Sequence, residues 1–425
     1  MRRQAGRFFT FFGLLFIAGT TLAPIPGQAT AAAATPLWCL ACGNHGGVDV
    51  FVNLLLFIPL AFGLRLWGLP AGRAVAAGAL ISLVVESLQL SVITGRDASL
   101  SDLVTNTLGS AAGGALASRM GGLLRPHRGA AAVLALGWAA AWLAIQAATA
   151  LLLQPWAPSG PLRAEWTGIT PGRPGFGGQV TFASLSGVPR PDGAISSLEL
   201  PDRPGQGRIE LELRIVSGPP VSRPTPLFEL LGPHGVLLSV DAAGKSLAFH
   251  APARTYLLRL RGPAIRLPDA LPETARRPVR IAAGEDGLTL WMSSAAGADR
   301  GARRLALSPS LGWSLVLPFE YAYGPEVHFL TALWVAGLLF PVGYWGRGSG
   351  SRLPLALGGA AGLLAAGLYL IAAFGGFPPA HWSEWVAGGV GLAAGWAGRG
   401  AAASPSRRCE SPPPQKLSSP FPAPA

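Results

Sequence analysis

The chain contains eight apolar stretches of roughly 20 residues, the length at which a helix crosses the hydrocarbon core of a bilayer. Charged residues make up only 13% of its 425 residues, about half the share found in soluble domains. Together these features predict an α-helical multi-pass membrane bundle of about 8 transmembrane helices. The predicted spans are residues 8–26, 50–69, 74–93, 102–118, 130–153, 325–345, 353–374 and 383–398.

The longest stretch without a span, residues 154–324, predicts an all-β domain. Short runs of alternating apolar and polar residues recur there between Pro and Gly turns, most clearly at Arg208–Val216. Such alternation is typical of strands with one buried and one wet face, and many short strands indicate a sandwich or jelly roll. We therefore predict an inserted, jelly-roll-like β-sandwich. It follows a five-helix domain (1–153) and precedes three helices (325–398) and a disordered, Pro- and Ser-rich tail (399–425).

The net charge of +12 is distributed unevenly. If the N-terminus is cytoplasmic and the spans alternate, the cytoplasmic pieces hold 14 basic residues and one acid, whereas residues 154–324 hold 18 basic and 14 acidic residues. An excess of Lys and Arg in short cytoplasmic loops is the positive-inside pattern. The charge therefore indicates topology, with both termini cytoplasmic and residues 154–324 extracytoplasmic, and argues against nucleic-acid binding.

Two cysteines and a histidine stand close together before the second span. Cys39, Cys42 and His45 have the spacing Cys-x-x-Cys-x-x-His, which suits a tight disulfide or a metal. Because only three potential ligands cluster, we favour a short disulfide or free thiols over zinc. The sequence therefore predicts no metal site and no cofactor.

Polar side chains occur at helical spacing inside three predicted spans and in one loop. Charged groups are costly in hydrocarbon and persist mainly where they pair or serve a function. Residues three or four apart share one face of a helix, and the alternation of spans brings all of these residues to the outer third of the membrane. We predict one outward-facing polar binding cluster consisting of Asp49, Asn53, Glu86, Gln89, Arg96, Asp102 and Asn106.

The fourth span carries two glycines in line with this polar face. Gly109 and Gly113 continue the stripe that begins at Asp102, and the pattern G-x-x-x-G allows a neighbouring backbone to approach closely. Ser99 or Ser101 is expected to cap the helix. Asp102 would then lie in the positive end of the helix dipole.

These residues resemble the motifs of the VanZ-like family of bacterial membrane proteins. The resemblance covers about residues 8–153 and implies a multi-pass protein of the bacterial cytoplasmic (inner) membrane. Because it includes the first helix, we favour retention of this helix over its removal as a signal peptide. The family's namesake is linked to resistance to teicoplanin, so glycopeptide resistance is an expectation here. The resemblance is carried by Asp49, Asn53, Phe57, Pro59, Gly63, Glu86, Gln89, Arg96, Asp102, Asn106, Gly109 and Gly113.

The β-domain resembles laminin-G-like and concanavalin-A-like sandwiches in the hairpin patterns of Phe228–His250 and Gly284–Met292. Many members of that fold bind sugars or proteins. Trp166, Trp291 and Trp313 could stack on a glycan or fill the core, and we favour the core.

Acidic and histidine residues of this domain carry no predicted site. Asp241 and Asp286 stand in expected turns, where Asp is common because it bonds its own backbone. His234 and His250 are isolated and are interpreted as ordinary surface or strand residues. Calcium is not expected.

Three interpretations of the polar cluster stay open. In the first, it only holds the helices together, at about 0.6 kcal/mol per hydrogen bond. In the second, it binds a polar lipid headgroup, a lipid-linked cell-wall precursor or an envelope glycan, with Arg96 holding phosphate and Glu86 and Asp102 holding hydroxyls or an amine. In the third, Glu86 and Asp102 act as acid and base of an enzyme for a lipid-linked envelope substrate. We favour an accessory or binding role at the cell envelope, with the lipid bilayer and an envelope glycan, precursor or protein as partners.

Overall fold

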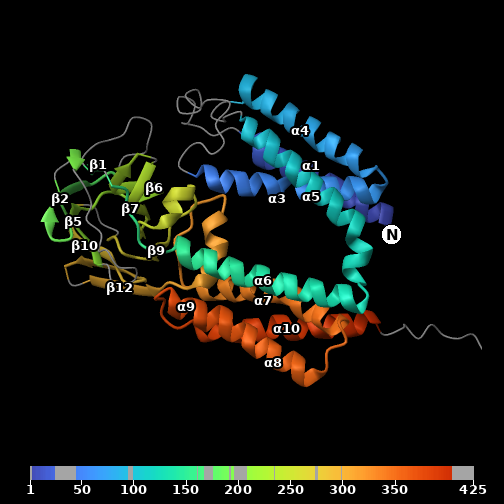
Figure 1. The fold of residues 1–425 in the computed structure, drawn as a ribbon. Helices are drawn as coiled ribbons and strands as arrows, with labels where there is room; N and C mark the ends of the chain where they lie inside the picture. Colours follow the sequence, from blue (N-terminus) through green and yellow to red (C-terminus); the bar gives the residue numbers. More distant parts are fainter. Residues whose placement is uncertain are drawn as a thin grey trace, which may run out of the picture.

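The computed structural model places the helices and the β-domain in separate parts of the molecule (Figure 1). Arg96, Cys39, Cys42 and the predicted disordered tail from residue 404 onward lie outside the residues that it describes. The described residues are 2–23, 45–93, 99–159, 161–166, 176–190, 193–195, 208–233, 235–272, 276–297 and 299–403.

Four helices of the N-terminal part pack side by side (Figure 1). Helices α1 (Arg2–Thr21) and α5 (Leu100–Leu124) lie against α3 (Gly46–Trp67). Helix α4 (Ala71–Ser91) lies against α5. This group contains every described residue of the predicted polar cluster.

The remaining helices form a second group. Helix α6 (Arg128–Leu152) packs against α7 (Val327–Gly348), and α7 packs against α10 (Trp382–Ala403). The ring of Trp142 in α6 is 1% exposed and lies where a Cβ of Gly367 would stand. The stretch before α10 consists of α8 (Leu353–Leu364), the π-helical turn η3 (Ala365–Leu370) and α9 (Ile371–Phe374).

Helices form at all eight predicted spans. In the described part of the chain, five helical stretches are long and apolar enough to cross a membrane, judged by length and composition. They are α3, α4, α6, α7 and the stretch Leu353–Phe374. A helical membrane bundle carrying a β-domain is therefore the architecture of this chain. The crossing of α1, α5 and α10 stays a prediction, because Gly and polar residues make these helices less apolar than the other five.

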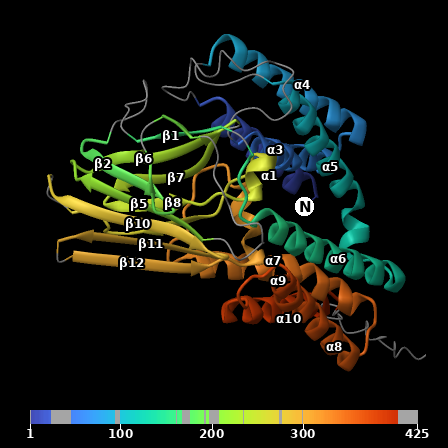
Figure 2. The ribbon, with the colours of Figure 1, turned by 60° about the vertical axis from the view of Figure 1, so that its left-hand side comes forward.

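Twelve strands of the described residues form the β-domain, and they are arranged in two antiparallel sheets of six. They are β1 (Leu162–Glu165), β2 (Gln179–Leu185), β3 (Val188–Pro189), β4 (Gly193–Ile195), β5 (Arg208–Val216), β6 (Val221–Gly232), β7 (Gly235–Gly244), β8 (Ser246–His250), β9 (Ala264–Leu267), β10 (Pro278–Asp286), β11 (Thr289–Ala296) and β12 (Asp299–Ala306). One sheet has the order β4-β1-β6-β7-β8-β9 and the other β12-β11-β10-β5-β2-β3. Figure 2 shows the two layers beside the ends of the helices. The prediction of an all-β domain is confirmed, and its relation to laminin-G-like folds stays a prediction.

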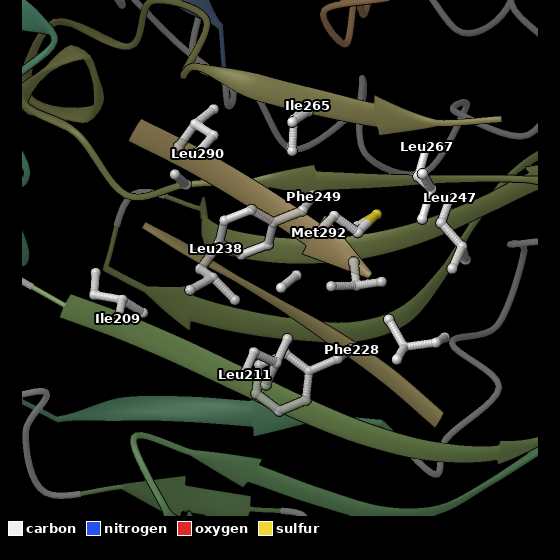
Figure 3. Close-up of a cluster of buried hydrophobic side chains, with 14 of the residues drawn as sticks. Ile209, Leu211, Phe228, Leu238, Leu247, Phe249, Ile265, Leu267, Leu290 and Met292 are labelled. Carbon is white, nitrogen blue, oxygen red and sulfur yellow. The ribbon is translucent and has the colours of Figure 1, made fainter. Parts of the chain in front are cut away.

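Alternation along β5 shows how the sequence pattern builds the sandwich core. Ile209 and Leu211 point between the sheets and are at most 2% exposed, whereas Arg214 on the other face is exposed. Phe228 and Leu238 meet them from the facing sheet (Figure 3). Burying each such side chain contributes about 1.5–3 kcal/mol, so the two inner faces hold the sheets together.

Two of the three tryptophans considered above pack against this core. Trp166 and Trp313 are half-buried beside it, which agrees with the favoured interpretation. Their indole N–H groups donate to the carbonyl oxygen of Arg190 (3.0 Å) and to the hydroxyl of Thr331 (3.2 Å). Trp291 instead lies half-buried on the outward face of β11, against Gly284.

Short 3-10 helices connect the sandwich to the helical groups. Helix η2 (Pro309–Val316) packs against α3, α6 and α7. The Gln146 amide of α6 donates to the hydroxyl of Ser310 at 3.0 Å. On the other side, Gly47 of α3 lies against the last carbonyl of η1 (Arg254–Leu258). The sandwich therefore sits at one end of both helical groups.

Close contact between α3 and α5 depends on two glycines. A Cβ at Gly109 would meet the carbonyl of Leu54, and a Cβ at Gly113 would meet that of Ile58. Backbone atoms cannot move aside as the end of a flexible side chain can. The two glycines therefore set the distance between these helices.

We expect Gly109→Ala to lower the melting temperature of the full chain in detergent, because the added methyl group would push α5 away from α3. Overpacking of this kind costs about 1–3 kcal/mol. Gly122→Ala in the same helix is the matched control, since nothing lies within 4 Å of a Cβ at that position. Thermal unfolding followed by circular dichroism makes the comparison, and equal melting temperatures for the two variants would contradict the packing argument.

Strand β10 places a carboxylate inside the sandwich. Glu285 lies on the inward face with Ile281 and Ala283 and is 1% exposed. Neither of its carboxylate oxygens has a hydrogen-bond partner among the described residues. Burial raises the pKa of Glu285 well above its ordinary value, because a charge without a partner is costly in an apolar interior.

This burial predicts that stability depends on pH. The folded pKa of Glu285 lies above the unfolded value of 4.5, so the unfolded chain releases this proton first as the pH rises. The contribution of protonated Glu285 to the free energy of unfolding is complete below pH 4.5. This contribution is lost as the pH rises through the folded pKa.

We expect Glu285→Gln to remove this loss and to raise the free energy of unfolding at pH 8 by about 1–3 kcal/mol. The effect should be smaller at pH 4.5. Thermal melts of the full chain at the two pH values measure it. Glu212→Gln, on the outward face of the neighbouring strand, is the control and should keep the pH dependence of the wild type.

Candidate functional site

The end of α4 and the start of α5 are joined through Glu86. The backbone N–H of Ser99 donates to a carboxylate oxygen of Glu86 at 2.8 Å. Ser99 is also the N-cap of α5, since its hydroxyl accepts from the N–H of Ser101 at 3.1 Å. Glu86 is 9% exposed. Asp102, in the first turn of α5, is close enough for its negative charge to act on Glu86.

One turn deeper, the same two helices are joined by an amide. The Asn106 side-chain N–H donates to the hydroxyl of Ser82 at 3.0 Å, and both residues are at most 2% exposed. The hydroxyl of Ser110 donates in turn to the main-chain carbonyl of Asn106 at 3.0 Å. Ser82 lies one helical turn from Glu86, so these groups form a continuous polar line across the α4–α5 contact.

Gln89 connects this line to the first helix. Its side-chain N–H donates to the main-chain carbonyl of Thr21, at the end of α1, at 3.0 Å. Gln89 is 8% exposed. Three helices, α1, α4 and α5, therefore meet at buried polar groups. The sequence patterns do not reveal the part played by Thr21, because a main-chain carbonyl carries no residue signal.

Two acceptor atoms in this region have no donor among the described residues. They are the side-chain oxygens of Gln89 and Asn106, and both are buried. A buried acceptor without a donor costs about 1–3 kcal/mol. The described part of the site is thus rich in acceptors, because Glu86 and Asp102 add carboxylates to the same region.

The α3 residues of the cluster lie at the same end of the helices, nearer the sandwich (Figure 1). Asp49 is exposed in the first turn of α3, and its charge acts on Arg261 of the β-domain. Asn53 is half-buried one turn further along. The buried centre therefore contains Glu86, Gln89 and Asn106, whereas Asp49 faces the junction with the sandwich. Arg96 lies outside the described residues.

We expect Asn106→Ala to destabilise the helical group by about 0.6–1.7 kcal/mol, the range for hydrogen bonds between membrane helices. The reason is the loss of the bond to Ser82. Thr107→Ala is the matched control, because the Thr107 hydroxyl bonds only within its own helix in the described structure, to the Leu103 carbonyl at 2.7 Å. Thermal unfolding in detergent compares the two, and a larger loss in the Thr107 variant would overturn the assignment.

Comparisons with known proteins place the N-terminal part of the chain. The model of the VanZ/LLP1 family matches residues 8–123, which contain every residue of the predicted polar cluster. This is shorter than the expected resemblance to residue 153, since α6 lies beyond the match. Comparisons with curated proteins and with solved structures give no significant match. The prediction from the motifs is confirmed: residues 8–123 form a VanZ-like region of the VanZ/LLP1 family.

Proposed function

We propose that this VanZ-like membrane protein binds the polar headgroup of a membrane-anchored envelope molecule at the buried polar groups of α4 and α5. We call them the Glu86 site, and its described members are Glu86, Gln89, Asp102 and Asn106. The observation that carries the proposal is the pair of buried side-chain oxygens, on Gln89 and Asn106, that lack a donor among the described residues. Groups that served packing alone would gain by pairing with each other. Hydroxyl or ammonium donors of a ligand would satisfy both oxygens.

The chemistry of the site defines the class of ligand. Glu86, Asp102 and the two amide oxygens are acceptors, which suits a sugar or an amine. Arg96 stands between α4 and α5 in the sequence and is proposed to hold a phosphate. A lipid-linked cell-wall precursor combines hydroxyls, phosphate and a lipid tail, so it fits this set best. Glycopeptide resistance is the phenotype that such binding would connect to.

The orientation is part of the proposal. The basic residues gather in the pieces that alternation assigns to the cytoplasm, while residues 154–324 are nearly balanced in charge. This supports a protein of the cytoplasmic membrane with both termini inside and the β-domain, residues 154–324, outside. The Glu86 site then opens toward the envelope, on the side where cell-wall precursors are used.

We expect Glu86→Gln and Asp102→Asn to weaken the binding of a polyprenyl-pyrophosphate-linked disaccharide by about tenfold or more, because each removes a charged acceptor. Binding is measured on the full chain in nanodiscs by native mass spectrometry, together with teicoplanin susceptibility of cells expressing each variant. Ser87→Ala is the control, since Ser87 is the exposed neighbour of Glu86 and bonds the Leu83 carbonyl of its own helix.

The same variants separate the alternatives. A binding site predicts weaker binding with an unchanged melting temperature. A role in packing alone predicts a lower melting temperature with no saturable binding by the wild type. An enzyme with Glu86 and Asp102 as acid and base predicts conversion of the probe by the wild type and loss of turnover, at kept affinity, in the variants.

A further inference from the structure

A cavity of about 310 Å³ lies between the β-sandwich and the N-terminal end of α3. One wall is the outward face of strands β6, β7 and β8. The other wall is made by η1, the segment after it, and residues 320–321. His45, the N-cap of α3, also lines the cavity. Figure 2 shows η1 between the sandwich and the helices.

The sheet wall carries a preorganised polar group. Asp241 accepts a hydrogen bond from the hydroxyl of Ser239 at 2.7 Å, and the same carboxylate oxygen lies 3.4 Å from a ring nitrogen of His250. Ser239 and His250 are direct neighbours on β7 and β8. Glu229 of β6, 8% exposed, adds a second carboxylate. These side chains stand on the face opposite the core, where an ordinary exposed sheet would meet water.

The facing wall carries a cation. Arg261 lies 3.9 Å from the carboxylate of Glu320, and its Nε donates to the Leu317 carbonyl at 3.3 Å. Burial lowers the pKa of Arg261, while the charges of Glu320 and Asp49 oppose that shift. The guanidinium is therefore held in place at the cavity wall, with donors directed by a fixed planar group.

His45 contributes a polar atom without a partner. Its Nδ1 is buried and has no hydrogen-bond partner among the described residues. Burial, with a smaller effect from the charge of Arg261, lowers the pKa of His45 to about 4. The imidazole is thus neutral at physiological pH and can both donate and accept.

The balance of charge selects the ligand. Three carboxylates line the cavity, on Glu229, Asp241 and Glu320, against one guanidinium. A phosphate or carboxylate would meet net repulsion, whereas hydroxyls and an ammonium group would find acceptors. The phenol rings of Tyr256 and Tyr321 also line the cavity and offer flat apolar surface. The volume lies at the small end of the range for ligand pockets.

We propose that this cavity binds a single sugar ring, neutral or amine-bearing, at the membrane surface. This site goes beyond the function proposed above and shares none of its residues. Its position at the first turn of a membrane helix suits either a free sugar or the sugar headgroup of a glycolipid.

Glucosamine, glucose and glucose 6-phosphate are the probes, titrated by saturation-transfer NMR against the full chain in phosphatidylcholine nanodiscs. We expect glucosamine and glucose to bind saturably and glucose 6-phosphate to bind at least tenfold more weakly than glucose. Asp241→Asn should weaken glucosamine binding about tenfold, the usual effect of losing a charged acceptor. Glu229→Gln is the second variant, in case Asp241→Asn does not fold. Glu212→Gln, a carboxylate of the other sheet that does not line the cavity, is the control.

Each outcome decides the proposal. The proposal is overturned if none of the three probes binds saturably, or if neither cavity variant changes the binding of glucosamine. It is also overturned if glucose 6-phosphate binds as tightly as glucose. Nanodiscs that contain a monoglucosyl diacylglycerol identify the source of the sugar. If free glucosamine binds more weakly in these nanodiscs, the glycolipid competes for the cavity, and the cavity takes a lipid headgroup. If glucosamine binding is unchanged, the cavity takes a free sugar. Glu86→Gln should leave glucosamine binding unchanged, so failure of one proposed site does not imply failure of the other.

Discussion

The hydrocarbon core of a bilayer offers no hydrogen-bond partners, and the N-terminal helices depend on this constraint. Hydroxyl groups such as that of Thr107 can bond a carbonyl of their own helix, whereas the amides of Gln89 and Asn106 find their acceptors where two helices come close. Gly109 and Gly113 bring the backbone of α5 against α3, and Gly78 leaves room in α4 for the side chain of Ser110. With the helices at this distance, Asn106 can reach Ser82 across the contact. The small residues thus let the helices come close enough for the polar side chains to bond across the contact.

The same constraint gives meaning to the two side-chain oxygens that lack a donor among the described residues. The amides of Gln89 and Asn106 each donate a hydrogen bond to another helix, and the oxygen of each amide has no donor among the residues that the structure describes. Donation fixes the orientation of each amide, so both acceptor oxygens are held in place. A ligand that brings donors would meet acceptors that need no rearrangement. This is the physical basis for proposing a binding role in place of packing alone.

The β-domain uses its sheets in two ways. Along β7, Leu238 and Val240 face the core at 0% exposure, while Ser239 and Asp241 face the opposite side. That opposite side would be solvent in a free sandwich. Here η1 and the start of α3 lie over it and enclose a polar cavity. Docking a sandwich on a membrane bundle therefore converts an ordinary outward face into a candidate site.

Periodicity and composition were sufficient for much of this architecture. The length of the apolar stretches predicts the positions of all eight helices, and alternation in Arg208–Val216 predicts strand β5 with its buried and exposed faces. The spacing of Glu86, Gln89 and Asn106 predicts shared helix faces, since residues three or four apart lie on one side of a helix. These features are local, so neighbouring residues along the chain carry them.

Contacts between distant segments could not be inferred in this way. Asp241 and His250 carry no site signal in the sequence, and the cavity exists only because residues 45, 261 and 320 lie opposite them. The sequence likewise does not predict that the carboxylate of Glu285 lies inside the core. Nor does it predict that the Thr21 carbonyl accepts a hydrogen bond from Gln89. Local patterns determine which face of a helix or strand is polar. Which segment covers that face depends on packing between parts of the chain far apart in sequence, and no local pattern encodes that packing.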